Sequence, residues 1–307
     1  MRTLLALCLA ASAALAQEQR ALGEEQAKRI VPRADLTGLT DAQRAVFVDA
    51  TTELVVYAGC EDTLAKCLAA GQTDPHALRM AELVKHMASE GIPATPIVQA
   101  VEKYYDSFSP RRRVQVRADN CPVLGKGPIA IVEFSDYQCP HCAAAVQPLH
   151  QLVEKDRKGK VRLCAKFFPF ASHPRARIAA LCAEYARGKG KFWEINGLLF
   201  AHQDQLEDDN LKQYAKELGL DGEEMLKKAY SGELDAQVEK HIREGTAAGV
   251  DSTPALFIDG RLSVLPARQF YLDFSIDDEL LWEKDHAWNP SAAAAAPAAK
   301  RMAKKGK

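Results

Sequence analysis

The spacing of apolar residues divides the chain into a helical first part and a mixed second part. Between Thr40 and Phe108, apolar positions recur every three or four residues, as on one face of an α-helix. Thr40, Asp74 and Thr95 stand where helix N-caps are expected, and a proline directly follows the last two. Short amphipathic helices must bury their apolar faces against one another, so we expect a small helical bundle over residues 40–110.

From Pro128 onward the pattern is that of strands alternating with helices. Residues 129–134 form an apolar run with a single acid, Glu133, which predicts a strand covered on both faces. A second strand is expected at residues 161–168, and a hairpin with a two-residue turn, Asp259-Gly260, at residues 255–264. Helical patterns fill residues 175–220 and 222–245. This order predicts an α/β fold around a central sheet.

Neither end of the chain has the pattern of a folded domain. Arg2 precedes an apolar run that ends in Ala14-Leu15-Ala16, a small-x-small cleavage pattern, so we expect a signal peptide over residues 1–16 and an exported, periplasmic or secreted protein. The alternative is an uncleaved anchor. Residues 17–39 are charged and poorly periodic, which predicts a flexible leader. Residues 289–307 are Ala-rich and then Lys-rich, which predicts a disordered tail.

Composition and charge exclude several classes of ligand. Hydrophobic residues make up 47% of the chain and charged residues 26%, as in ordinary globular proteins, and the net charge is −1. Nothing in this balance favours nucleic acid or an anionic membrane as a partner. The sequence has no H-E-x-x-H spacing, no second C-x-x-C and no Gly-rich phosphate loop, so we expect no metal and no cofactor.

Cys139 and Cys142 are the strongest candidates for chemistry. They are three residues apart at the start of a predicted helix that directly follows an apolar strand. One helical turn places such residues side by side, near enough for a disulfide. Half of a zinc site, a structural disulfide and a haem attachment are the alternatives. Haem attachment requires a histidine after the second cysteine, where this chain has Ala143. We therefore predict a redox centre.

The two thiols are expected to have different roles. Cys139 is predicted at an exposed helix start, where free N–H groups and the helix dipole stabilise a thiolate, and His141 adds to this effect. Cys142 lies one turn further in and should be more buried. We therefore expect Cys139 to attack or be attacked and Cys142 to resolve the mixed disulfide. Stabilising the thiolate stabilises the reduced form, which makes the disulfide an oxidant.

Thr253-Pro254 directly precedes the first strand of the predicted hairpin. A proline at this position can be a cis-proline packed against a site. The alternative is an ordinary trans proline that opens an edge strand.

The remaining cysteines have less certain partners. Removal of Cys8 with the signal peptide leaves seven, and an odd number leaves at least one thiol unpaired or paired between chains. Cys60 and Cys67 would lie about 10 Å apart on one continuous helix, so they can bond only if the chain bends between them. A structural disulfide between them, or from one of them to Cys121, is expected. Cys164 and Cys182 are candidates for a further structural bridge, with two buried free thiols as the alternative.

Four segments together resemble the DsbA-like branch of the thioredoxin superfamily: FSDYQCPHC, FFPF, GKFWEINGLLFAHQ and TPALFIDG. The resemblance implies a thioredoxin domain over residues 120–288 with a helical insertion at about residues 175–220. It also implies that Pro254 is cis and lies against the cysteine pair, with Thr253 presenting backbone groups to a bound peptide. Glu133 matches the buried acid of this family beneath the resolving cysteine. A buried carboxylate without a partner has a raised pKa, which suits proton exchange with Cys142. A half-exposed strand acid is the alternative.

The resemblance leaves the direction of the reaction open. Pro140 and His141 between the cysteines are typical of the oxidising members, whereas threonine before the cis-proline is commoner in isomerases and reductases. Isomerases of this superfamily carry N-terminal dimerisation modules. The segment GCEDTLAKCLAAG and the helices after it also resemble the three-helix domain of cytochrome c maturation thiol proteins.

We predict an exported thiol–disulfide oxidoreductase that acts on cysteine-containing secreted proteins, as a dithiol oxidase. The alternatives are a dimeric isomerase or reductase, serving cytochrome c maturation in one version, and a non-catalytic chaperone or docking module. A membrane partner that re-oxidises or reduces the site, and a homodimer formed through the bundle, are the partners this prediction implies.

Overall fold

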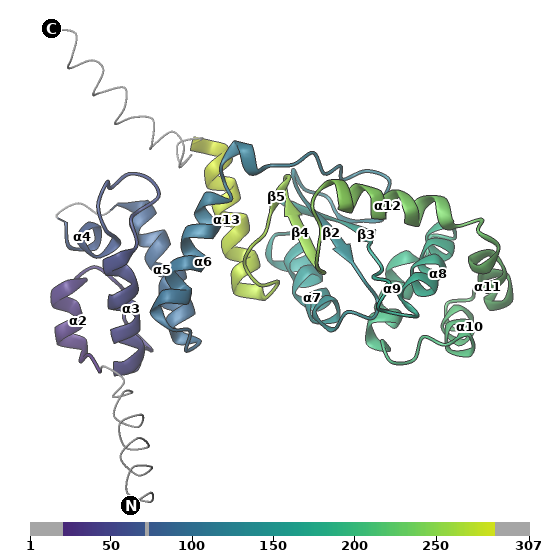
Figure 1. The fold of residues 1–307 in the computed structure, drawn as a ribbon, viewed down its shortest axis with the longest axis horizontal. Coiled ribbons are helices and arrows are strands. Elements are labelled where there is room, and N and C mark those ends of the chain that lie inside the picture. Colours follow the sequence, from purple (N-terminus) through teal and green to yellow (C-terminus); the bar gives the residue numbers. More distant parts are fainter. Residues whose placement is uncertain (1–20, 71–73, 286–307) are drawn as a thin grey trace, which may run out of the picture. The chain divides into compact units, whose positions relative to one another are not determined.

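The computed structural model describes residues 21–70 and 74–285, which divide into two compact units (Figure 1). Unit 1 contains the described residues up to Asp106, and unit 2 runs from Ser107 to residue 285. The predicted signal peptide and C-terminal tail lie outside the described residues. No helix of the described ranges is long and apolar enough to cross a membrane.

Unit 1 is a helical bundle, as the apolar spacing predicts. Its described helices are α2 (Glu24–Ile30), α3 (Asp41–Glu53), α4 (Leu64–Ala69), α5 (Pro75–Ser89) and α6 (Ala94–Asp106). Thr40 caps α3 by accepting from the Gln43 amide, and Asp74 caps α5 by accepting from the amides of His76 and Ala77. The amphipathic faces meet in a core that includes Phe47, Leu64 and Leu83, each fully buried.

The flexible leader predicted over residues 17–39 is wrong for its described part. Residues 24–30 form α2, and Ala27, Val31, Leu36 and Leu39 are buried. Within α2 itself only Ala27 is buried, so the helix has no apolar stripe that would predict it, and the other three residues follow it in the sequence.

The Cys60–Cys67 disulfide is present in unit 1, with Cα atoms 6.0 Å apart. It forms because the two cysteines do not share one helix: α3 ends at Glu53, Gly59 has φ +81°, and α4 begins only at Leu64. The chain therefore bends between the cysteines, as their bonding requires.

Unit 2 is built on a five-stranded sheet with the order β1-β3-β2-β4-β5. The strands are β1 (Val123–Gly125), β2 (Ile129–Ser135), β3 (Val161–Phe167), β4 (Ala255–Ile258) and β5 (Arg261–Leu262). β2 and β3 are parallel, and the other pairs are antiparallel. The predicted α/β class and thioredoxin fold are confirmed. In the hairpin turn, Asp259 and Gly260 have φ values of +46° and +84°, as a type I′ turn requires.

Helices cover both faces of this sheet. One face packs on α7 (Pro140–Gln151), the π-helical turn Leu152–Asp156 and α13 (Gln269–Asp285). The other face packs on α12 (Asp235–Ala247), whose Gly245 allows a close approach: a Cβ there would lie 2.6 Å from the Phe168 ring. β2 is consequently buried on both faces, as its unbroken apolar run predicts.

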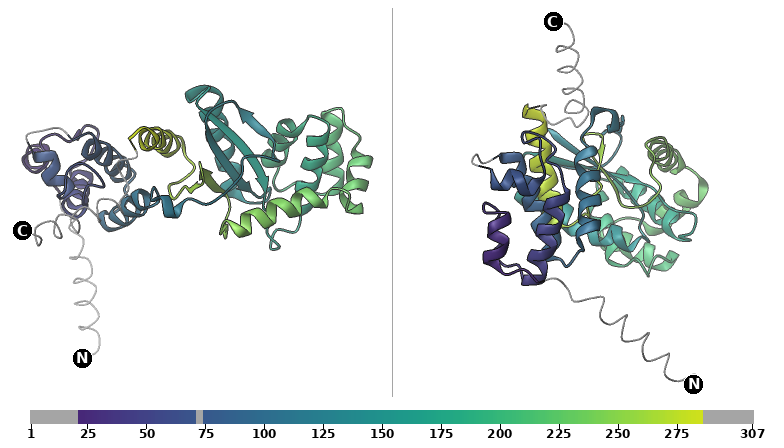
Figure 2. Two further views of the ribbon diagram at one scale, coloured as in Figure 1. Left: turned by 90° about the horizontal axis from the view of Figure 1, so that it is seen from above. Right: turned by 60° about the vertical axis from the view of Figure 1, so that its left-hand side comes forward.

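A helical insertion follows β3 and gathers at one side of the sheet (Figures 1 and 2). It comprises α8 (Ala176–Gly188), α9 (Phe192–Ala201), α10 (Asp208–Glu217) and α11 (Gly222–Ser231). The helix predicted over residues 222–245 is in fact two helices, α11 and α12. Gly232, with φ +87°, ends α11 in a left-handed conformation, and the chain turns before α12.

The predicted Cys164–Cys182 bridge is wrong: Cys164 bonds to Cys121, and Cys182 is a buried free thiol. Side chains alternate across a strand, so Cys164 faces α12 together with Val132 and Phe134, whereas Ala165 and Phe167 face the insertion that carries Cys182. The two sulfur atoms therefore lie on opposite sides of the sheet. Cys121, just before β1, lies on the same side as Cys164.

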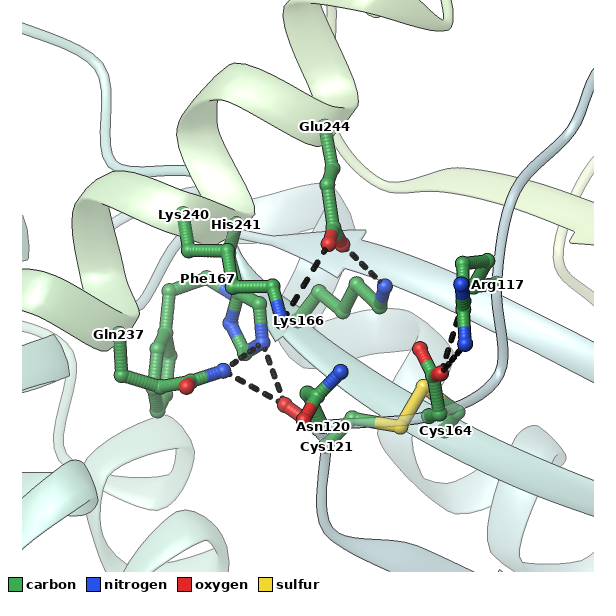
Figure 3. The surroundings of a disulfide bond; sticks show 11 residues. Arg117, Asn120, Cys121, Cys164, Lys166, Phe167, Gln237, Lys240, His241 and Glu244 are labelled. Atoms are coloured by element: carbon green, nitrogen blue, oxygen red, sulfur yellow. Dashed lines mark hydrogen bonds and ion pairs between the residues drawn. A yellow bond between two sulfur atoms is a disulfide. The ribbon is translucent and has the colours of Figure 1, made fainter.

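Buried polar groups surround the Cys121–Cys164 bridge (Figure 3). The fully buried Lys166 ammonium pairs with Glu244 of α12. The Phe167 amide donates to Nδ1 of His241 at 3.2 Å, so the other ring nitrogen carries the hydrogen and donates to the Asn120 carbonyl at 2.9 Å. Burial lowers the pKa of His241 to about 4, which keeps this ring neutral. The segment before β1 is thus held covalently to β3 and by a hydrogen bond to His241 of α12.

Removing the Cys121–Cys164 bridge should cost more stability than removing Cys60–Cys67. The first bridge spans 43 residues and the second spans 7. Loop-closure entropy then gives losses of about 4 and about 2.4 kcal/mol respectively. Urea unfolding of Cys121→Ala with Cys164→Ala, beside Cys60→Ala with Cys67→Ala, measures both. A larger loss for the second pair would contradict this reading of the two bridges.

Candidate active site

The cysteine pair lies just beyond the C-terminal end of β2. The strand ends at Ser135, and Cys139 is the N-cap of α7 in an extended conformation. Pro140 occupies the first helical position, where its missing N–H would have no partner within the helix in any case. The local sequence therefore fixes a strand, a short loop and a helix start in immediate succession.

The two thiols differ less in burial than the sequence predicts. Cys142 is completely buried and Cys139 is only 5% exposed, so the expectation of an exposed Cys139 is wrong. Cys139 packs in a cluster of buried residues with Tyr137 and Cys142, and its Sγ donates to the carbonyl oxygen of Thr253 at 3.2 Å. Pro140 and His141, in contrast, are exposed beside it. Both cysteines are free thiols in this structure.

Glu133 is a buried carboxyl in electrostatic range of Cys142. It is 6% exposed, and within the described residues its Oε1 has no hydrogen-bond partner. Burial raises the pKa of Glu133 from the ordinary 4.5 to about 7, against a smaller lowering by the Ser135 hydroxyl. Burial also raises the pKa of the Cys142 thiol, and the Glu133 carboxylate adds to that rise. Such a carboxyl can give up or take a proton near neutral pH.

The peptide bond between Thr253 and Pro254 is cis, and it lies against the cysteines. Antiparallel pairing of β2 with β4 brings the two segments together, because Phe134 is opposite Ala255. A groove of about 540 Å³ opens beside this contact. Its lining is largely apolar or uncharged, with one basic side chain, and comprises His141, Ala144, Ala145, Ser252, Thr253, Pro254, Leu256, Ser263, Leu265, Pro266, Ala267 and Arg268.

The structure thus brings together Cys139, Cys142, Glu133, Thr253 and Pro254, with His141 at the rim. Cys60 and Cys67 belong to the other unit, and Cys164 faces the opposite side of the sheet. In the described part of the chain, no group of three or more His, Cys, Asp or Glu side chains is arranged to hold a metal ion.

Sequence reasoning missed the residues that hold the loop before Cys139. Asp136 is buried and accepts from the Phe170 amide and from His173 Nδ1, each at 2.8 Å. The Tyr137 hydroxyl donates to Asn196 at 2.9 Å, and the Gln203 side-chain amide donates to the Tyr137 and Cys139 carbonyls. Asn196 and Gln203 belong to the GKFWEINGLLFAHQ stretch, whose polar residues were the available signal.

Comparison with known proteins places this site in a family. A family model described as thioredoxin matches residues 123–278, just over half of the chain. The chain therefore belongs to the thioredoxin family.

Among solved structures, oxidised BdbD from Bacillus subtilis is similar to this chain, with 26% sequence identity and a TM-score of 0.51. The similarity covers 55% of this chain and 97% of BdbD. A thioredoxin-like oxidoreductase from Silicibacter pomeroyi has 28% identity and a TM-score of 0.47, over 52% of this chain and 92% of that one. The predicted resemblance to DsbA-like oxidoreductases is confirmed, and the fold supports thiol–disulfide exchange.

Among curated proteins, this chain is similar to one part of a much longer protein. The Na(+)/H(+) antiporter NhaA 3 of Salinispora tropica is 32% identical over 151 residues, which is 48% of this chain but only 23% of the antiporter. This chain therefore spans less than a quarter of the length of the first curated relatives that it matches.

The buried Glu133 should make stability depend on pH. Because its pKa is raised in the folded state, protonated Glu133 stabilises the fold fully below about pH 4.5, and this contribution is lost as the pH rises through about 7. The loss by pH 8 is about 3 kcal/mol. Glu133→Gln has no titrating carboxyl at this position and therefore does not suffer this loss. The free energy of unfolding of the variant should rise relative to that of the wild type between pH 5 and pH 8.

The difference in free energy of unfolding between the wild type and Glu133→Gln contains the contribution of Glu133 but not that of His241, which both proteins share. The lowered pKa of His241 gives the opposite slope, since that stability is lost as the pH falls from 6.5 toward about 4. Urea unfolding at several pH values measures the difference. A difference that stays constant across this range would show that Glu133 does not titrate as described.

Proposed function

We propose that this chain is an exported thiol–disulfide oxidoreductase that passes the Cys139–Cys142 disulfide to secreted proteins, as a dithiol oxidase. The observation that carries the proposal is the contact of Cys139, at the N-terminus of α7, with the carbonyl of Thr253 before a cis proline. The buried pair Cys142 and Glu133 stands directly behind it.

The reaction starts from the oxidised pair. A substrate thiolate attacks Sγ of Cys139, a bond forms between the two sulfurs, and the Cys139–Cys142 bond breaks. Cys142 leaves as a thiolate in a site where burial raises its pKa, so it takes up a proton readily, and Glu133 with a pKa of about 7 is the adjacent donor. A proton source at this point lowers the cost of expelling a buried anion.

A second substrate thiolate then attacks the substrate sulfur of the mixed disulfide. The bond to Cys139 breaks, Cys139 leaves as a thiolate, and the substrate keeps the new disulfide. Two electrons have passed to the enzyme, whose dithiol must be re-oxidised by a disulfide of a membrane partner or by a small disulfide such as oxidised glutathione. The N–H groups at the start of α7 stabilise the Cys139 thiolate and so favour this direction.

The groove beside Pro254 supports a peptide as the substrate. Its largely apolar lining suits side chains that are exposed in an incompletely folded protein. The exposed His141 lies at the rim, where a substrate cysteine approaches. Thr253 is positioned to offer backbone groups to an extended chain, in the manner of an added strand.

Export is supported by the cysteines outside the redox pair. Both the Cys60–Cys67 and the Cys121–Cys164 pairs are bonded, and disulfides of this kind persist in oxidising compartments. The N-terminal sequence has the order of a signal peptide, with a basic residue, an apolar run and a small-x-small site.

A disulfide isomerase or reductase is the second candidate. Threonine before the cis proline and a separate helical unit favour it, because isomerases of this superfamily have the first and use N-terminal modules to dimerise. The reduction potential and the molecular mass in solution separate the two. A monomer with a potential nearer to roughly −120 mV than to roughly −270 mV supports the oxidase, and a dimer that repairs scrambled disulfides contradicts it.

Cys139→Ser should abolish oxidation of a reduced two-cysteine peptide, because the attacked sulfur is gone. When a disulfide-bonded peptide is supplied, Cys142→Ala should instead accumulate a mixed disulfide, because the Cys139 thiolate opens the peptide disulfide, one peptide sulfur leaves as a thiolate, and no second enzyme thiol remains to release the adduct. Non-reducing electrophoresis and mass spectrometry detect this adduct. Cys182→Ala is the matched control, since Cys182 is also a buried free thiol, and it should keep wild-type activity. Peptide oxidation at the wild-type rate by Cys139→Ser would rule out the proposal. Partner binding that survives loss of both Cys139 and Cys142, without exchange, would indicate a chaperone or docking module instead.

A further inference from the structure

The turn that follows α9 reaches from the helical insertion to the redox centre. Gln203 lies in this turn, and its Nε2 donates to two backbone oxygens, those of Tyr137 and Cys139, at 2.8 Å each. Both partners are carbonyls, so only the NH₂ end of the amide can satisfy them and the orientation of the side chain is unambiguous. One side chain thus holds two carbonyls of the loop that presents the attacking thiol.

This turn is itself fixed by the insertion. The ring of His202 stacks on Tyr214 of α10 at 5.3 Å, and the Tyr214 hydroxyl donates to the Gln205 carbonyl at 2.9 Å. On the other side, the ring of Phe200 lies 4.7 Å from the ring of Tyr137. These contacts hold the turn that carries Gln203, and a side chain that positions another group needs such support.

The two carbonyls matter because of the charge that develops beside them. The oxygen of Cys139 belongs to the residue whose sulfur becomes a thiolate, and the oxygen of Tyr137 lies two residues earlier. Carbonyl oxygens carry partial negative charge and oppose a nearby anion. The Thr253 carbonyl, which accepts from the Cys139 thiol, opposes the thiolate in the same way once that proton is lost. Hydrogen-bond donors placed on the carbonyls reduce their negative potential.

The Cys139 carbonyl already accepts from the Cys142 and Ala143 amides, at 3.1 and 3.3 Å, as the first turn of α7. Gln203 adds a third donor from outside the helix. This donor extends the effect of the helix N-terminus to the loop before it, where Tyr137 has a carbonyl that α7 cannot reach.

We propose that Gln203 is a positioning residue that raises the reactivity of Cys139 by holding the carbonyl oxygens of Tyr137 and Cys139 with a single amide. It acts through the backbone and not by contact with substrate. The proposal deepens the proposed function and rests on it in one respect, that Cys139 is the attacking thiol.

Three substitutions at Gln203 test the proposal by charge. Gln203→Leu removes both donors, Gln203→Glu places a carboxylate against two carbonyls, and Gln203→Lys supplies a cationic donor of similar reach. Thiolate reactivity at pH 6 should fall threefold to about tenfold for Leu, fall further for Glu, and stay at or above the wild-type value for Lys. The measurement is the pH profile of Cys139 alkylation by iodoacetamide in a Cys142→Ala background, where the other free thiol of residues 21–70 and 74–285, Cys182, is fully buried.

The equilibrium with glutathione gives a second readout in chains with both cysteines. A tenfold loss for Gln203→Leu corresponds to a potential about 30 mV more reducing. Gln205 provides the matched control, because it is the same residue type two positions on and its side chain is exposed. Gln205→Leu and Gln205→Glu should leave both the alkylation profile and the equilibrium unchanged.

A purely structural role for Gln203 would give a different set of results. All three Gln203 variants would then lower the melting temperature, while the alkylation profile and the glutathione equilibrium stayed at wild-type values, and this outcome overturns the proposal. If Gln205→Glu shifted the alkylation profile and the glutathione equilibrium as much as Gln203→Glu does, the proposal would be overturned too. The effect would then come from any added negative charge near the site and not from the hydrogen bonds of Gln203. A wild-type chain without exchange activity would instead count against the proposed function, whereas an active wild type with a flat Gln203 series counts only against the role of Gln203.

Discussion

The contact between Sγ of Cys139 and the carbonyl oxygen of Thr253 is the interaction on which the arrangement of the site depends. It joins two segments that are 114 residues apart, at 3.2 Å. The antiparallel pairing of β2 with β4 brings the two segments together, and β2 is a central strand that is buried on both faces. The groove, the helix start and the buried acid are all placed relative to this one contact.

Behind the contact, the protein maintains a region in which charge is unfavourable. Cys142 and Glu133 are both removed from water, so burial raises the pKa of each, and the Glu133 carboxylate adds to the rise in the pKa of the Cys142 thiol. In isolation this would be a liability, because a buried charge without a partner destabilises a fold. In the proposed thiol exchange, Glu133, with its pKa of about 7, can supply the proton that the departing Cys142 thiolate takes up.

Local pattern predicted much of this site because its parts are local in sequence. Cys139, Cys142 and Glu133 lie within one strand–loop–helix segment, and the C-x-x-C spacing shows in the sequence directly. The position of Thr253-Pro254 before the hairpin strand allowed either a cis-proline at a site or an ordinary trans proline, and only the resemblance indicated that it faces the cysteine pair. The Cys121–Cys164 bridge could not be predicted, because it depends on which face of β3 each side chain occupies. Gln203 was missed for a related reason: its partners are backbone carbonyls, which leave no trace in a sequence. α2 escaped notice because its burial comes from the bundle and not from its own periodicity.

The Cys121–Cys164 bridge has a consequence for how the protein itself is made. In the newly synthesised chain, the next cysteine after Cys121 is Cys139 of the proposed redox pair, and Cys164 comes later. Shorter loops close at lower entropic cost, so an unfolded chain favours the pairing of Cys121 with Cys139 over the native pairing with Cys164. The alternation of side chains on β3 corrects this preference, because only a formed sheet presents Cys164 to Cys121. Folding of this chain therefore requires a choice between disulfide pairings, and formation of the sheet determines which pairing is made.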